Sequence, residues 1–215
     1  MGEITDSDDY RVWMNEEMLD SVTNYECYRY FFSCANNKTM LDFSKCLQRQ
    51  FGENGIYKDS TLYTFVDNHD VNRIVNMIKS KKNLRNLYTL LYTIPGTPSI
   101  YYGSEWAIEG KKEHRSDAAL RPAIDTENPD IIDAELMEHL KKLAEIRQSS
   151  PALKSGTYKE ICAEKDYFIF ARISENDTKL IFINISGKAQ TLSADFEGKR
   201  YEFIIPAYSS KIADK

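Results

Sequence analysis

The sequence predicts an α/β fold in which parallel βα units are followed by a small antiparallel β domain. From the start of the chain to about Ser150, short apolar runs alternate with longer helical patterns. After Pro151 the pattern changes to strands separated by turn residues. We therefore expect two domains, which cover residues 1–150 and 151–215.

The first region contains predicted strands and helices in alternation. The strand-like runs are rich in β-branched and aromatic residues, and each ends in polar residues or glycine. Apolar residues at helical spacing mark the helices, as at Leu136, Leu140, Leu143 and Ile146. The predicted strands cover residues 19–24, 62–66 and 98–102, and the predicted helices cover residues 39–51, 83–93 and 133–148.

The second region is predicted to form antiparallel strands over residues 167–172, 179–184 and 201–205. Asn176-Asp177 and Ser186-Gly187-Lys188 supply the turns between these strands. A region of about 60 residues is too short for a barrel but long enough for a sandwich.

Composition and charge narrow the range of partners. The chain is 42% hydrophobic and 28% charged, which is typical of a globular protein. Its net charge of −5 argues against nucleic acid or an anionic membrane as partner, so a neutral ligand fits better. The polar first residues do not form a signal peptide, and the localisation stays open. The four cysteines lack the spacing of a metal site, and we expect free, mostly buried thiols.

A cluster of polar residues follows the second predicted strand. Asp67, Asn68, His69, Asp70 and Arg73 fall within seven positions of the sequence. The carboxyl ends of parallel strands form the mouth where ligands bind, so the cluster indicates a pocket. A turn and helix cap would use the same residue types, and the motif alone leaves both interpretations open.

Two further segments become informative in combination with this cluster. Glu3, taken alone, would be a solvated charge near the start of the chain. Tyr101, Tyr102 and Trp106 follow the third predicted strand, and aromatic rings of this kind stack on the apolar faces of sugars. The two tyrosines would equally well fill the interior of a barrel.

In order and spacing, these segments resemble the later sequence blocks of the α-amylase family of glycoside hydrolases. Gly2-Glu3 resembles the end of the family's fifth barrel strand, and residues 20–25 resemble its sixth. Residues 65–70 resemble the seventh strand, residues 95–103 the eighth, and Leu120-Arg121-Pro122 the segment just beyond. The resemblance implies the second half of an incomplete (β/α)8 TIM barrel, followed by the antiparallel β-sandwich domain of this family.

The resemblance also implies catalytic roles. Glu3 would be the general acid/base, which protonates the departing glycosidic oxygen and later deprotonates water. Asp70 would be the third carboxylate, which holds sugar hydroxyls and helps to distort the ring toward the oxocarbenium-like transition state. His69 would donate hydrogen bonds to the same hydroxyls. Asn68, Arg73 and Trp106 are further candidates for binding the substrate, although Asn68 could instead brace the loop together with Asp67.

One departure from the family concerns the residues after the acid. The family often has an aromatic residue there, whereas Thr5-Asp6-Ser7-Asp8 follows in this sequence. The leaving-group side of the site is therefore expected to differ.

The family's nucleophilic Asp lies in a Gly-x-Arg-x-Asp pattern before the acid, and only Met1-Gly2 precede Glu3 in this sequence. We therefore expect a fragment of a retaining α-glucan hydrolase that does not hydrolyse α-glucans alone. Its class could be α-amylase, cyclomaltodextrinase, neopullulanase-like or transglycosylase. One alternative is a non-catalytic module that binds maltooligosaccharides or has a regulatory role. The other is a purely structural α/β protein.

The expected partner is an α-glucan oligosaccharide, and the exposed edges of a half barrel favour self-association. No metal site or cofactor is predicted. Calcium is common in the family, but no oxygen-rich loop in this sequence requires it.

Overall fold

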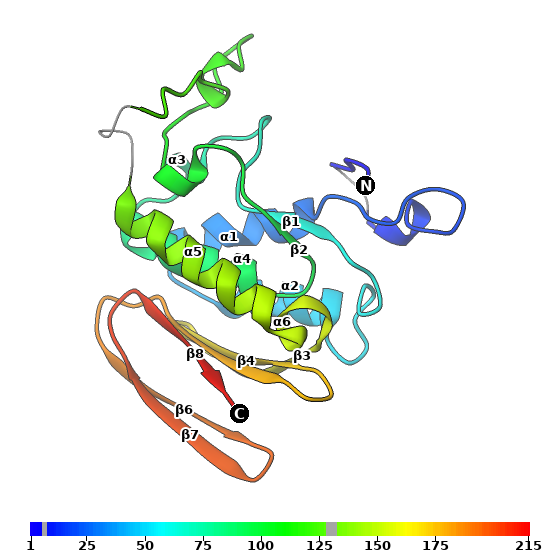
Figure 1. Ribbon diagram of the computed structural model, residues 1–215, viewed down its shortest axis with the longest axis vertical. Coiled ribbons are helices and arrows are strands. Elements are labelled where there is room, and N and C mark those ends of the chain that lie inside the picture. Colours follow the sequence, from blue (N-terminus) through cyan, green and yellow to red (C-terminus); the bar gives the residue numbers. More distant parts are fainter. Residues whose placement is uncertain (6–7, 128–132) are drawn as a thin grey trace.

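The computed structural model describes residues 1–5, 8–127 and 133–215. Helices and short parallel strands form one layer, a four-stranded sheet forms the second, and a β-hairpin forms the third (Figure 1). Of the segment that departs from the family after Glu3, Asp6 and Ser7 lie outside the described residues. Within the described ranges, every helix is too short or too polar to cross a membrane.

The N-terminal region forms part of a parallel barrel. Gly2 bridges Val22, and Thr23 bridges Tyr63, both in parallel. Strand β1 (Tyr63–Phe65) then pairs in parallel with β2 (Thr97–Ser99). Neighbours in space therefore follow the order of the chain, as they do in a (β/α)8 barrel.

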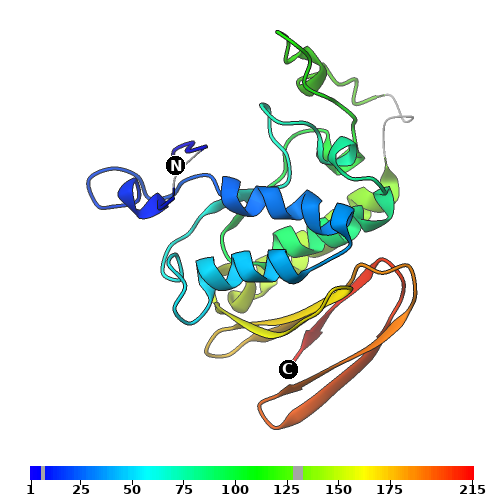
Figure 2. The same cartoon turned by 180° about the vertical axis from the view of Figure 1, so that it is seen from behind.

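Helices fill the connections that follow the second and third of these strand positions. The connection after Val22 and Thr23 contains α1 (Tyr25–Asn37) and α2 (Leu41–Phe51). The connection after β1 contains α3 (Ile74–Met77) and α4 (Leu84–Thr93). Figure 2 shows α1 and α2 side by side on the outside of the strands. Short 3-10 turns complete the region at Tyr10–Val12, Lys81–Asn83, Ser104–Trp106 and Ala118–Leu120.

The barrel strands are shorter than predicted. The strand expected over residues 19–24 contributes only bridging residues, because Asn24 already caps α1 by accepting a hydrogen bond from the Cys27 amide (3.0 Å). The strand expected over residues 98–102 ends at Ser99, because the chain turns at Gly103, where φ is +84°. Helix α1 was not predicted, since its aromatic residues have modest helix propensity.

The C-terminal region is an antiparallel β-structure, as predicted. One sheet has the strand order β3-β4-β5-β8, and β6 and β7 form a separate hairpin. The three predicted strands correspond to β4, β5 and β7, and the structure adds β3, β6 and β8. The strands are β3 (Thr157–Ala163), β4 (Tyr167–Ile173), β5 (Thr178–Asn184), β6 (Gln190–Phe196), β7 (Lys199–Ile205) and β8 (Ser209–Asp214).

The central sheet is buried on both faces. Alternate side chains of β4 point to opposite sides, so Phe168 and Phe170 pack into the helical core while Ile169 and Ala171 pack against the hairpin. Helices α5 (Ala134–Ser149) and α6 (Pro151–Ser155) connect the barrel region to this sheet. The expected sandwich is therefore present, and its inner sheet also closes the core of the partial barrel.

The prediction of free, mostly buried thiols is confirmed. Cys27, Cys34 and Cys46 are buried, Cys162 is half-buried, and all four are free. Burial raises the pKa of the Cys34 thiol to about 12, which keeps it protonated at neutral pH.

Candidate active site

Three of the predicted site residues lie together at the carboxyl ends of strands of the partial barrel. Glu3 follows the bridging residue Gly2, and His69 and Asp70 follow β1. One potential ligand atom from each of the three side chains lies within 4.8 Å of the others. All three side chains remain accessible to solvent, and the side chains of His69 and Asp70 are 46% and 42% exposed. The arrangement is a small, open, mainly acidic site.

Tyr25, at the start of α1, holds the carboxylate of Glu3. Its hydroxyl donates a hydrogen bond to Glu3 Oε1 (2.7 Å) and accepts one from Asn68 Nδ2 (2.9 Å). Burial, together with the hydrogen bond to Glu3, raises the pKa of Tyr25 to about 12, so the phenol stays a donor at neutral pH. The sequence did not single out Tyr25, although its place directly after a barrel strand was a usable signal.

Replacing Tyr25 by Phe is expected to lower the free energy of unfolding by about 1 kcal/mol, because it removes a hydroxyl that makes two hydrogen bonds. Urea denaturation followed by circular dichroism measures this change. Tyr30→Phe is the matched control on the same helix, since Tyr30 is only partly buried. Equal losses in both variants would show that the contact with Glu3 stabilises nothing.

Arg121 positions the carboxylate of Asp70. Its Nη2 lies 2.7 Å from Asp70 Oδ1, and its Nε donates to the backbone oxygen of His69 (3.1 Å). His69 Nε2 lies 3.5 Å from the other oxygen, Asp70 Oδ2. Both oxygens of Asp70 therefore face a nitrogen of a basic side chain. Arg121 belongs to a segment that carried the family resemblance, but sequence reasoning gave it no role.

Asn68 uses both ends of its side chain within the protein. Its oxygen accepts hydrogen bonds from the backbone amides of Asp70 (2.9 Å) and Val71 (3.2 Å), and its nitrogen donates to Tyr25. This placement favours the loop-bracing alternative for Asn68 over direct substrate binding.

Asp67 lies beneath the loop and is only 1% exposed. Its Oδ2 accepts a hydrogen bond from the amide of Ile74 (2.9 Å), and its Oδ1 accepts one from Ser104 Oγ (2.7 Å). Burial raises the pKa of Asp67, and these hydrogen bonds oppose that shift. Asp67 thus ties the loop that bears His69 to the loop that follows β2.

Arg73 was expected to bind substrate, but the structure places its side chain in the interior, with 0% exposure. Its Nη1 donates to the backbone oxygen of Tyr102 (2.7 Å) and to Ser104 Oγ (3.2 Å). The guanidinium carbon lies 4.1 Å from the centre of the Tyr101 ring. A fully buried side chain cannot contact a ligand at the surface, so Arg73 acts here as an internal anchor of the loop.

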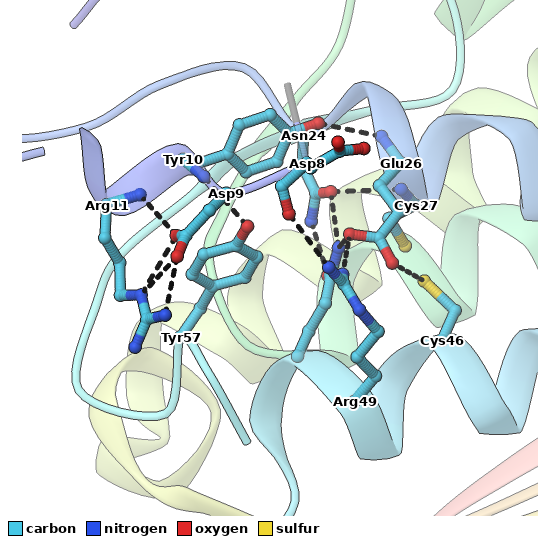
Figure 3. Close-up of polar contacts among 11 residues, drawn as sticks. Asp8, Asp9, Tyr10, Arg11, Asn24, Glu26, Cys27, Cys46, Arg49 and Tyr57 are labelled. Carbon is cyan, nitrogen blue, oxygen red and sulfur yellow. Dashed lines mark hydrogen bonds and ion pairs between the residues drawn. The ribbon is translucent and has the colours of Figure 1, made fainter. Parts of the chain in front are cut away.

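The segment after Glu3 is tied to α1 and α2 by polar contacts (Figure 3). Tyr10 donates its amide hydrogen to Tyr57 Oη (2.9 Å), and its own hydroxyl accepts a hydrogen bond from the amide of Glu26 (3.0 Å). Arg49 forms an ion pair with Glu26 and donates to the backbone oxygen of Asp8 (3.0 Å). These contacts restrict the chain on the downstream side of the predicted acid.

Trp106 packs against α5, where its Nε1 donates to Met137 Sδ (3.2 Å). It borders a pocket of about 530 Å³ that Tyr102 and Arg121 also line. Trp106 is not among the residues that contact Glu3, His69 or Asp70 in the described part of the chain.

Glu3, His69 and Asp70 are also the group of described residues whose ligand atoms are close enough to share a metal ion. Calcium takes six to eight oxygen ligands, whereas this group offers two carboxylates and an imidazole. The group therefore does not fit the calcium that is common in the family, and no chemical step is derived through a metal.

Two carboxylates close together at the mouth of a partial barrel are the kind of site that glycoside hydrolases use. Residues 1–132 match the family described as the α-amylase catalytic domain. The chain belongs to the α-amylase family.

Relatives of known name support the same assignment. A maltogenic α-amylase of Bacillus acidopullulyticus is 27% identical over 198 residues, which cover 86% of this chain and 32% of that protein. A cyclomaltodextrinase of a Bacillus species is 26% identical over 186 residues, which cover 84% of this chain and 32% of that protein. The chain thus spans about a third of the length of these relatives.

The fold agrees with solved members of the family. An α-amylase from Geobacillus thermoleovorans, solved in complex with acarbose, superposes with a TM-score of 0.84 at 20% identity. The superposition covers 99% of this chain and 52% of that chain, and it includes both the partial barrel and the β-rich C-terminal region.

Proposed function

We propose that this chain supplies the general acid/base and the third carboxylate of a retaining α-glucan hydrolase. The observation that carries the proposal is the convergence of Glu3, His69 and Asp70, whose ligand atoms lie within 4.8 Å of one another at the ends of two barrel strand positions that flank the one at Val22 and Thr23. The order of the barrel segments and membership of the α-amylase family support it.

In this proposal, Glu3 protonates the glycosidic oxygen as the bond breaks and later removes a proton from water. Tyr25 keeps the carboxyl group pointed at that oxygen through its hydrogen bond to Oε1. Asp70 accepts hydrogen bonds from hydroxyls of the sugar and His69 donates to them, while the ion pair with Arg121 holds the carboxylate of Asp70 in position. Binding of this kind favours the distorted ring of the transition state.

Asp70 is assigned to binding and not to nucleophilic attack. The carboxyl groups of a retaining pair lie about 5–5.5 Å apart, so the distance between Glu3 and Asp70 would by itself allow attack. However, Arg121 and His69 face the two oxygens of Asp70, and such contacts reduce the nucleophilicity of a carboxylate. A polypeptide of these 215 residues should therefore bind maltooligosaccharides without hydrolysing them.

Asp70→Asn is expected to weaken the binding of maltoheptaose about tenfold, because a charge-assisted hydrogen bond to a sugar hydroxyl becomes a neutral one. Isothermal titration calorimetry on the 215-residue chain measures the affinity, and chromatography of the sugars measures turnover. Asp125→Asn is the control, since Asp125 is exposed and does not touch the cluster in the described structure. Unchanged affinity in Asp70→Asn would refute the binding role. Turnover that Glu3→Gln abolishes would overturn the expectation that this chain binds without hydrolysing.

The alternative function is a non-catalytic module that binds maltooligosaccharides. The same ion pair between Arg121 and Asp70 favours it, because the pair builds a binding group and not a nucleophile. The two proposals make different predictions for a polypeptide with a complete barrel. Only the enzyme proposal requires that such a polypeptide hydrolyse α-glucans and that Glu3→Gln abolish this hydrolysis.

A further inference from the structure

A second cavity lies away from the Glu3 cluster, where the partial barrel meets the β-structure. It has a volume of about 740 Å³, within the range of small-molecule sites. The starts of α4 and α5 meet the connection between β7 and β8 there, on one side of the molecule in both views (Figures 1 and 2). It is lined by Lys81, Lys82, Leu84, Arg85, Trp106, Ala107, Asp133, Leu136, Ala207 and Tyr208. Glu3, His69, Asp70 and the residues that contact them are not among these, and Trp106 lines both this cavity and the pocket that Arg121 borders.

Two aromatic rings border this cavity. Trp106 is tied through its ring nitrogen to Met137. Tyr208 lies over Gly187, where any added Cβ would fall 2.8 Å from the phenol oxygen, so a larger side chain there would displace the ring. Lys82 Nζ lies 5.5 Å from the centre of the Tyr208 ring. A tryptophan and a tyrosine that border one cavity can both stack on sugar rings.

The backbone is strained where it presents two of the lining residues. Ala107 and Tyr208 have φ values of +57° and +53°, in the left-handed region that non-glycine residues rarely adopt. Strained residues of this kind concentrate at ligand sites, where the surrounding structure holds them in place.

The charges around the cavity balance one another. Lys81 pairs with Glu109 (2.7 Å), and Arg85 pairs with Glu135. Lys82 adds a positive charge, and the carboxylate of Asp133, which caps α5, adds a negative one. A balanced set of charged donors and acceptors beside aromatic rings suits a neutral polyhydroxyl ligand better than an anion.

We propose that this cavity is a second sugar-binding site, which takes an α-linked maltooligosaccharide through Trp106 and Tyr208. The class of sugar rests on the proposed function, whereas the cavity, the rings and the charges do not. A site at this junction would hold one part of a long glucan chain while another part reaches the Glu3 cluster.

The two tryptophans of the chain provide a test. Trp13→Phe leaves Trp106 as the sole tryptophan, and the effect of a Tyr208 substitution on its fluorescence then separates this cavity from the pocket at Tyr102, which Trp106 also borders. Titration with maltoheptaose is expected to change that fluorescence, and adding Tyr208→Gly should weaken the response about tenfold because one stacking ring is lost. Glycine accepts the left-handed backbone, so this variant should fold, and Tyr208→Phe keeps the ring and should keep the response.

Asp70→Asn separates this proposal from the function proposed for the cluster. If the cavity is an independent site, the Trp106 response persists in the Trp13→Phe, Asp70→Asn double variant with unchanged midpoint. No response to maltoheptaose, a response insensitive to Tyr208→Gly, or one abolished by Asp70→Asn would each overturn the proposal. A normal Trp106 response together with unchanged calorimetry in Asp70→Asn would refute only the binding role of the cluster.

Discussion

Asn184→Asp is expected to lower the free energy of unfolding by about 4 kcal/mol, because it places a carboxylate against backbone oxygens in the core. Asn184 ends β5 and is 0% exposed. Its Nδ2 donates to the backbone oxygens of Lys188 (2.8 Å), Pro206 (2.9 Å) and Ile205 (3.1 Å). Its Oδ1 accepts hydrogen bonds from Ser186 and Gln190. This single amide joins the loop before β6 to the connection between β7 and β8.

Urea denaturation followed by circular dichroism checks this prediction. The control is Asn176→Asp, since Asn176 is exposed in the turn before β5. Like Asn184, it is the first residue of an Asn-x-Ser/Thr triplet. The control should change stability by about 0.5 kcal/mol or less. A loss below about 1 kcal/mol in Asn184→Asp would mean that the carboxyl group is protonated or hydrated in the folded protein and that the amide is not essential.

Local pattern predicted the parts of the fold whose side chains repeat regularly. Helices α2, α4 and α5 begin within two residues of their predicted starts, because apolar residues recur at helical spacing. Strand β8 was missed because its sequence, Ser209-Ser210-Lys211-Ile212-Ala213-Asp214, lacks both a continuous apolar run and clear alternation. Pairing with β5 creates this strand, and pairing is a property of the tertiary fold.

Prediction of the site depended on the family resemblance and not on local chemistry. Glu3 looks like a solvated charge in the sequence, and only the folded barrel brings it to Asp70. The position of Tyr25 after a barrel strand could have marked it as a candidate, but the contacts of Tyr25 and Arg121 could not be predicted, because each joins residues far apart in the sequence. Arg73 was predicted to bind substrate but is buried, since charge type does not reveal which members of a polar cluster turn inward.

Arg73→Met is expected to lower the free energy of unfolding by about 3 kcal/mol at neutral pH, because it removes the hydrogen bonds of a buried guanidinium and its favourable Coulombic interaction with Asp67. Arg73 and Asp67 are 0% and 1% exposed, and the charge of Arg73 lowers the pKa that burial raises in Asp67. Methionine fills much of the volume of arginine but cannot donate to the backbone oxygen of Tyr102. Denaturation in urea measures the loss, and Arg29→Met, at an exposed position on α1, is the control.

The pH dependence of this loss distinguishes charge from packing. In the variant, the pKa of Asp67 in the folded state should rise further above its unfolded value of about 4. A carboxyl group with a raised pKa binds protons more tightly in the folded state, so its contribution to stability is present at low pH and is lost as the pH rises through the folded pKa. The deficit of Arg73→Met should therefore be smaller at about pH 4 than at about pH 7. Equal deficits at both pH values would mean that Arg73 stabilises the loop through packing on Tyr101 and its hydrogen bonds alone. A smaller deficit at acidic pH would show that the charge of Arg73, through its effect on Asp67, helps to hold the loop that carries His69 and Asp70.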